Sequence, residues 1–249
     1  ILKENYMKNK INFYSYPLLY ALFMAISGFI ISNFFHVNYA EPVYVQKKLP
    51  FLIIAALVVS VCVWLKRDSI KPKWEKDGRL ALYLVYMIPL FLVIIYFWIS
   101  KGNFSISFLI PFITTFFVGL GEELVMRRVL FVGLLNEKGF WKALFISSII
   151  FGILHGISIF SGMPVNQALM QIGMTFMAGL FLGMMYEYTK KIHFVILQHW
   201  LWDYLILSGV AKENKVIGLV VIGMIILQVV LTIILMIRKY KKMKETYVE

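Results

Sequence analysis

Four ionisable side chains stand inside long apolar stretches of this sequence: Glu122, His155, His199 and Asp203. Carboxylates and imidazoles are the groups that enzymes most often use to take up and return protons. At the centre of a membrane helix, an ionisable side chain costs about 2.5–3.5 kcal/mol on insertion scales, so its presence needs a reason. We therefore predict that these four side chains meet at one catalytic site.

The spacing of the charged residues predicts which of them pair on one helix and which need a partner on another helix. Glu123 and Arg127 are four residues apart with the acid first, which is the favourable order for an ion pair on one helix. Glu122 lies about 100° around that helix, so it must find its partner on another helix. His199 and Asp203 repeat the four-residue spacing, which lets a carboxylate orient an imidazole.

Hydrogen bonding between helices is the competing explanation for polar residues in a membrane, and it contributes roughly 0.6–2 kcal/mol per bond. It suits Glu123 with Arg127, which we expect to be structural. Two further acids and two imidazoles exceed what helix packing requires. The remaining ionisable residues at the ends of apolar blocks are expected at the membrane interface: His36, Arg128, Glu187 and His193.

The elements that position these residues are predicted to be membrane helices. Of 249 residues, 61% are hydrophobic and only 15% are charged, whereas a soluble domain is about 25% charged. A helix needs about 20 apolar residues to cross the hydrocarbon. We predict a single all-α integral membrane domain over residues 1–249, with about eight transmembrane helices. The apolar blocks are 15–35, 50–65, 80–99, 107–135, 140–158, 166–188, 192–209 and 216–237, of which the second is short and the fourth long.

The net charge of +12 is distributed as expected for a membrane protein. Most Lys and Arg residues fall on one side of the predicted bundle, which predicts that both termini face the cytoplasm (N-in, C-in). The basic tail "RKYKKMK" is expected against anionic headgroups, so the charge does not indicate a nucleic-acid partner. The lipid bilayer is the partner that it does indicate. Cys62 is the only cysteine, which excludes an intrachain disulfide.

Three short motifs in order resemble those of the CAAX-protease and bacteriocin-processing (CPBP) family of intramembrane glutamic endopeptidases, which includes the type II CAAX prenyl endopeptidases. The motifs are E-E-x-x-x-R, F-x-x-x-H and H-x-x-x-N/D. They are matched by Glu122, Glu123 and Arg127, by Phe151 and His155, and by His199 and Asp203. The resemblance covers a core of residues 104–209, and the other blocks match in hydropathy only.

The resemblance implies that Glu122 and His155 hold and deprotonate the attacking water, and that His199 with Asp203 lines the oxyanion site. Glu123 and Arg127 would be structural or orienting, and no cofactor or metal would be required. The sequence departs from the family pattern at Met126, at Arg128, which adds bulk and charge beside the site, and at Asp203, where Asn is common. Because an ionised Asp cannot donate a hydrogen bond, we expect Asp203 to orient His199, which supplies the donor.

Other classes of protein stay open. Two His and a carboxylate could bind zinc in a metalloprotease, although no H-E-x-x-H occurs. Glu122 with Asp203 could form an acid dyad, and Ser158 or Ser161 could be a nucleophile without a G-x-S-x-G motif. Non-enzymatic alternatives are a bacteriocin-immunity or receptor-like protein and a proton-coupled transporter.

We favour the hypothesis that this protein is a metal-independent endopeptidase that cleaves a membrane-associated peptide or protein. Peptide-pheromone or bacteriocin precursors in a bacterial plasma membrane fit the resemblance best. One difficulty concerns depth, because Glu122 lies in the middle of its block whereas His155 is late in its own. We expect a strong tilt, or a break at Gly119 and Gly121, to bring them level.

Overall fold

The computed structural model describes residues 12–39, 41–74, 78–102, 105–209 and 214–246, and all regular elements in these ranges are helical. The α-helices are α2 (Ser15–Phe34), α3 (Pro42–Leu65), α4 (Ala81–Lys101), α5 (Ile106–Glu123), α6 (Val132–Lys138), α7 (Phe140–His155), α8 (Val165–Thr189), α9 (Ile192–Leu207) and α11 (Lys215–Thr246). A π-helix, η1 (Leu124–Phe131), joins α5 to α6, and a 3-10 helix, η2 (Gly156–Ser161), follows α7.

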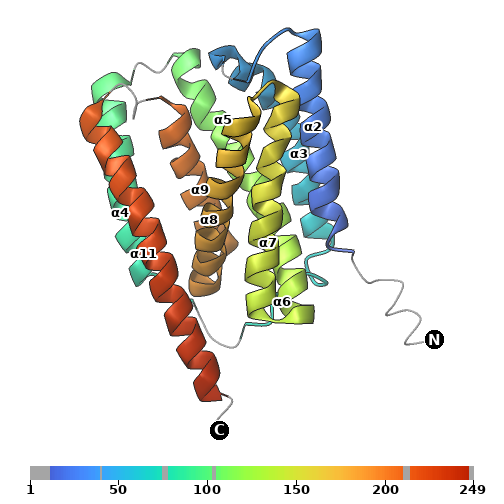
Figure 1. Cartoon of the computed structure of the whole chain (residues 1–249), viewed down its shortest axis with the longest axis vertical. Coiled ribbons are helices and arrows are strands. Elements are labelled where there is room, and N and C mark those ends of the chain that lie inside the picture. The colour runs from blue at the N-terminus through green and yellow to red at the C-terminus, as the bar shows by residue number, and fades with distance from the viewer. Residues whose placement is uncertain (1–11, 40, 75–77, 103–104, 210–213, 247–249) are drawn as a thin grey trace, which may run out of the picture.

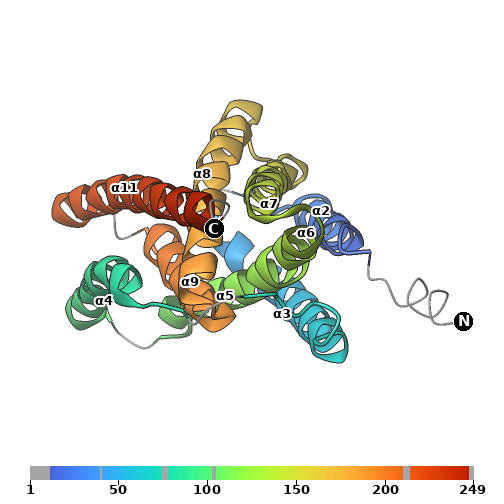
Figure 2. The ribbon, with the colours of Figure 1, turned by 90° about the horizontal axis from the view of Figure 1, so that it is seen from below.

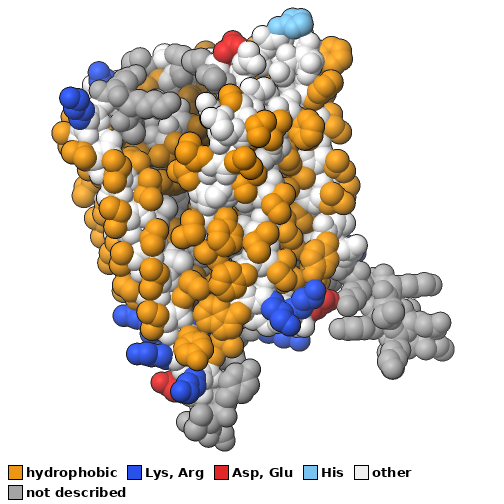
Figure 3. Space-filling model, viewed as in Figure 1, with side chains coloured by type: hydrophobic (Ala, Val, Ile, Leu, Met, Phe, Trp, Pro, Cys, Tyr) orange, Lys and Arg blue, Asp and Glu red, His pale blue; other side chains and the backbone are white. Residues whose placement is uncertain are grey.

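The helices form one upright bundle, and the prediction of an all-α polytopic membrane protein is confirmed (Figures 1 and 2). Within the described residues, seven helices are long and apolar enough to cross a membrane. The eighth apolar helix, α9, has only 16 residues. Hydrophobic side chains cover the visible flank in a broad band (Figure 3).

The N-terminal end of α2 and the C-terminal end of α11 lie at the same end of the bundle (Figure 1). Lys and Arg side chains gather at that end below the hydrophobic band (Figure 3). This arrangement agrees with two termini on one side of the membrane. That this side is cytoplasmic stays a prediction from the charge distribution.

The second apolar block begins earlier than its hydropathy indicates. The sequence places its start at residue 50, but α3 begins at Pro42 and has 24 residues. The additional turns include Lys47, whose ammonium lies 5.1 Å from the Phe35 ring centre, and Lys48, which is buried. The prediction of a short second helix is therefore wrong, because these two lysines belong to the helix and not to the preceding loop.

Glu122 and His155 lie at the same depth, because the two helices that carry them form a hairpin. Helices α5, η1 and α6 run on without a break from Ile106 to Lys138, and α7 returns after Gly139. Gly139 has a φ of +82°, a conformation that favours glycine. Glu122 and His155 stand almost equally far along the chain from this turn, so each helix carries its residue to the same level. No break occurs at Gly119 or Gly121.

Gly119 instead permits the close approach of α9 to α5. A Cβ atom at this position would lie only 3.0 Å from the backbone nitrogen of Trp200. The indole nitrogen of Trp200 also donates a hydrogen bond to the Phe112 carbonyl on α5, at 2.8 Å. These contacts fix the two helices side by side, and they place His199 opposite the glutamates.

Candidate active site

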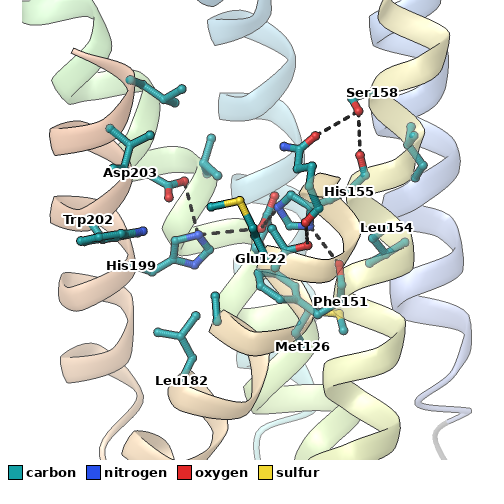
Figure 4. Close-up of a pocket in the computed structure, with 18 of the residues that line it drawn as sticks. Glu122, Met126, Phe151, Leu154, His155, Ser158, Leu182, His199, Trp202 and Asp203 are labelled. Atoms are coloured by element: carbon teal, nitrogen blue, oxygen red, sulfur yellow. Dashed lines mark hydrogen bonds and ion pairs between the residues drawn. The ribbon is translucent and has the colours of Figure 1, made fainter. Parts of the chain in front are cut away.

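The carboxylate of Glu122 lies between two imidazoles from different helices (Figure 4). Its Oε2 atom is 3.7 Å from His155 Nε2 on α7 and 3.9 Å from His199 Nε2 on α9. Glu122 Oε2 makes no hydrogen bond to the described residues, although it is buried. The structure therefore brings together three of the predicted site residues from α5, α7 and α9.

His155 is oriented by its own helix. Its Nδ1 atom lies 2.9 Å from the Phe151 carbonyl, so Nδ1–H donates to the backbone and Nε2 is turned toward Glu122. The Phe151 ring packs edge-on against the His155 ring. These contacts give the F-x-x-x-H spacing a physical role, because the residue one turn earlier determines which ring nitrogen faces the site.

Glu123 occupies a closed environment beside this site. One carboxylate oxygen lies 2.8 Å from His199 Nδ1, and the other lies 3.3 Å from Arg127 Nε. The side chains of Glu123 and Arg127 are 0% exposed, and the guanidinium carbon of Arg127 stands 4.7 Å from the Phe151 ring centre. Glu123 thus links the buried Arg127 to the imidazole of His199.

Asp203 approaches His199 from the side of the cavity. Its Oδ2 atom is 3.3 Å from Nε2, the same nitrogen that faces Glu122. Because Glu123 already holds Nδ1, Asp203 is not the only group that orients His199. His199 thus has a carboxylate beside each ring nitrogen, and an orienting role of Asp203 stays a prediction.

A cavity of about 830 Å³ contains this cluster. It extends from α2 and α3, past Glu122 and His155, to α8, α9 and α11. Methionine side chains are a common feature of its wall, and their flexible thioethers adapt to varied apolar groups. The lining methionines are Met24, Met126, Met163, Met170, Met174 and Met177.

The two residues beside Arg127, Met126 and Arg128, differ in whether they line the cavity. Met126 is one of its lining residues, whereas Arg128 is not. The expectation that Arg128 adds bulk and charge beside the site is therefore wrong. Ser158 lies within hydrogen-bonding distance of the His155 carbonyl and Gln171, and Ser161 accepts a hydrogen bond from Tyr44.

Two observations bear on the alternative chemistries. Among the residues that the structure describes, no group of three or more His, Cys, Asp or Glu side chains is arranged to hold a metal ion. The alternative of an acid dyad concerns Glu122 and Asp203. Each of these two carboxylates approaches His199 Nε2, so the imidazole is a neighbour of both.

Sequence reasoning missed one charged residue of the cavity, Lys48 on α3. The predicted second block begins only at residue 50, because the two adjacent lysines before it interrupt the hydropathy. The signal that could have found Lys48 is Pro42, since proline is frequent in the first turn of a helix. A helix that starts there contains both lysines and turns one of them inward.

The fold and the site together define a class of protein: a multi-pass integral membrane protein whose polar cluster opens into an internal cavity. The comparison with protein families shows what part of this chain is similar to. Residues 103–205 match the model described as type II CAAX prenyl endopeptidase Rce1-like. The match confirms the resemblance to the CAAX proteases over the part of the chain that carries all three motifs. No curated protein and no solved structure matches the chain.

Proposed function

We propose that this protein is an intramembrane glutamic endopeptidase that hydrolyses a peptide bond with a water molecule activated by Glu122 and His155. The observation that carries the proposal is the position of the Glu122 carboxylate, 3.7 and 3.9 Å from two imidazole nitrogens at a cavity. Polar groups separated by more than about 3.5 Å can be bridged by water.

In the first step, the water oxygen attacks the carbonyl carbon of the scissile bond while Glu122 accepts a proton. His155 Nε2 positions the same water, because its Nδ1 is already committed to the Phe151 carbonyl. The tetrahedral intermediate then collapses, the C–N bond breaks, and Glu122 returns the proton to the leaving amine. One carboxylate thus serves as general base and then as general acid.

The developing oxyanion requires donors that are already oriented. His199 Nε2–H is the donor that we assign, with Nδ1–H held by Glu123 at 2.8 Å. Asp203, with Oδ2 3.3 Å from Nε2, is the second carboxylate that orients this imidazole. Arg127 compensates the charge of Glu123, so that Glu123 can hold His199 in a closed apolar environment.

We propose a membrane-associated peptide or protein as the substrate. The cavity is mostly apolar, has a flexible methionine-rich wall and contains the cluster, so a hydrophobic peptide segment fits it. Peptide-pheromone and bacteriocin precursors have this character, and they are the substrate classes that we would test first in a bacterial membrane.

The test is cleavage of candidate peptides by the purified protein in liposomes, followed by mass spectrometry. Glu122→Gln should lower kcat by at least about 10²–10⁴-fold, the range of general acid–base catalysis, and should leave folding unchanged. His155→Ala and His199→Ala should also abolish most activity. Glu187→Gln is a matched control, because it removes an equally buried carboxylate outside the cavity.

A protein that binds its partner without cleavage would give the opposite result. Its cellular phenotype would survive Glu122→Gln, and no product would form with the wild type. Chelator-sensitive cleavage together with stoichiometric bound zinc would instead identify a metalloprotease. Either outcome would overturn the proposed water activation by Glu122.

A further inference from the structure

Tyr20 on α2 carries a buried hydroxyl that forms no hydrogen bond to any described residue. The residue is 7% exposed, and it lines the cavity that also contains Glu122. Buried tyrosine hydroxyls usually have a partner. Three others in this bundle do, because Tyr44, Tyr83 and Tyr86 are hydrogen-bonded to Ser161, the Phe194 carbonyl and Gln228. The hydroxyl of Tyr20 is thus a donor on the cavity wall that the described protein groups leave unused.

Gly121 places this hydroxyl beside Glu122. A Cβ atom at Gly121 would lie 3.0 Å from the Tyr20 oxygen, so the glycine leaves room for the hydroxyl. Gly121 directly precedes Glu122, and neighbouring Cα atoms are about 3.8 Å apart. The Glu122 carboxylate is close enough to interact electrostatically with the hydroxyl, but the two groups do not hydrogen-bond each other. Polar groups at such a separation can be bridged by a water molecule.

The attacking water of the proposed mechanism has one position for a donor of this kind. Its two hydrogen atoms point to Glu122 Oε2 and to His155 Nε2, which is an acceptor because Nδ1–H is donated to the Phe151 carbonyl. One of its two lone pairs attacks the carbonyl carbon. The other lone pair can accept a hydrogen bond, and the Nε2–H of His199 is already assigned to the oxyanion.

We propose that Tyr20 is a further catalytic residue, whose hydroxyl donates a hydrogen bond to the attacking water. This inference rests on the proposed function and adds a residue that lies outside residues 103–205, to which the family match assigns no role. Tyr20 keeps its proton throughout, because the proton of the water passes to Glu122 while the new C–O bond forms. The hydrogen bond directs the remaining lone pair toward the carbonyl carbon, so it contributes to kcat and not to substrate binding.

The first test removes the oxygen atom and keeps the ring. Tyr20→Phe should lower kcat for a peptide that the wild type cleaves by about 3- to 10-fold, the factor expected from one neutral hydrogen bond, with unchanged KM. Tyr44→Phe is the matched control, because it removes a hydroxyl from the same cavity that is bonded to Ser161, and it should change neither constant. Thermal unfolding in liposomes checks that both variants are folded.

The second test measures binding without turnover. The probes are two fluorescein-labelled leucine–alanine decapeptides in which the central carbonyl is replaced by CH(OH) or by CH₂, so that one probe brings a hydroxyl to the position of the water. Their Kd values are measured by fluorescence anisotropy in phosphatidylcholine nanodiscs. The wild type should bind the hydroxyl probe at least about tenfold more tightly than the methylene probe. Tyr20→Phe should reduce this advantage by about 3- to 10-fold and leave binding of the methylene probe unchanged.

Several outcomes would overturn the proposal. They are an unchanged kcat in Tyr20→Phe, an equal decrease in Tyr44→Phe, or a rise in KM alone, which would assign Tyr20 to substrate binding. Equal binding of the two probes by the wild type, or an advantage that Tyr20→Phe retains, would also overturn it. A wild-type protein that prefers the hydroxyl probe through Tyr20 but does not cleave would refute only the proposed catalysis.

Discussion

Two clusters of ionisable side chains lie within the apolar bundle, and their geometry differs. At the basic end, Glu187 Oε1 lies 2.7 Å from Lys190 Nζ and 2.9 Å from Lys239 Nζ, so one acid is held by two cations. At the cavity, Glu122 stands 3.7 and 3.9 Å from its histidines. Both carboxylates are similarly buried, at 13% and 14% exposed.

The difference indicates how a structural acid can be distinguished from the acid that we propose to be catalytic. The Glu187 cluster has short contacts, and its cations also pack on aromatic rings, with Lys190 Nζ 4.1 Å from the Trp74 ring centre and Lys239 Nζ 4.8 Å from that of Phe140. Burial lowers the pKa of Lys190, and the nearby Glu187 offsets only part of this decrease. Glu122 has no comparable set of short contacts, since its Oε2 makes no hydrogen bond to the described residues. Its side chain lines the cavity.

The largest effect on stability is expected from breaking the closed pair next to the site. Arg127→Met removes the guanidinium from the buried Glu123 and leaves it only His199 as a partner, and removal of one partner of a buried ion pair costs about 3–5 kcal/mol. We expect a large loss of thermal stability in detergent and no measurable cleavage. The double variant Arg127→Met/Glu123→Gln should recover part of the stability, because it leaves no charge unpaired. A single variant as stable as the wild type would contradict this interpretation.

A smaller effect on catalysis should follow from moving α9 relative to α5. Gly119→Ala places a methyl group about 3.0 Å from the backbone of Trp200, which is tighter than ordinary contact, so α9 must shift by a few tenths of an ångström. Small misplacements of catalytic groups can cost up to about 10²-fold in rate. We expect kcat to fall about tenfold with little change in KM. Gly173→Ala, with open space around its Cβ, is the control that should leave kcat unchanged.

Asp203→Asn should have a comparable or smaller effect that reports on His199. The substitution removes a negative charge 3.3 Å from Nε2 but leaves Glu123 on Nδ1. We expect a folded protein whose kcat falls about three- to tenfold, because the imidazole loses one of its two carboxylate neighbours and is held less firmly. The measurement is kcat for peptide cleavage in liposomes, beside thermal unfolding of the same variant. An unchanged kcat would show that Asp203 has no orienting role.

The lengths of the apolar blocks were sufficient for most of the fold, because lipid requires each spanning block to be a helix. The positions of Glu122, His155 and His199 on three helices were also accessible, since the motifs lie in three separate blocks. The equal depth of Glu122 and His155 could not be predicted from the sequence, because it depends on the turn at Gly139 and on the continuity of α5 through η1. The inward turn of Lys48 was missed for a related reason, as hydropathy alone cannot place a lysine inside a helix.

The smallest expected effect belongs to the basic end, and it completes the comparison between the two clusters. Lys239→Met removes one of the two cations on Glu187 and leaves Lys190 in place, 2.7 Å away. We expect a smaller loss of stability than for Arg127→Met, because Lys190 still pairs with Glu187, with unchanged kcat and KM. Thermal unfolding and peptide cleavage, measured on the same liposome preparation, check both parts. If kcat fell as far as it does in Asp203→Asn, the two clusters would be coupled, because α8 and α11 both line the cavity and would transmit the change.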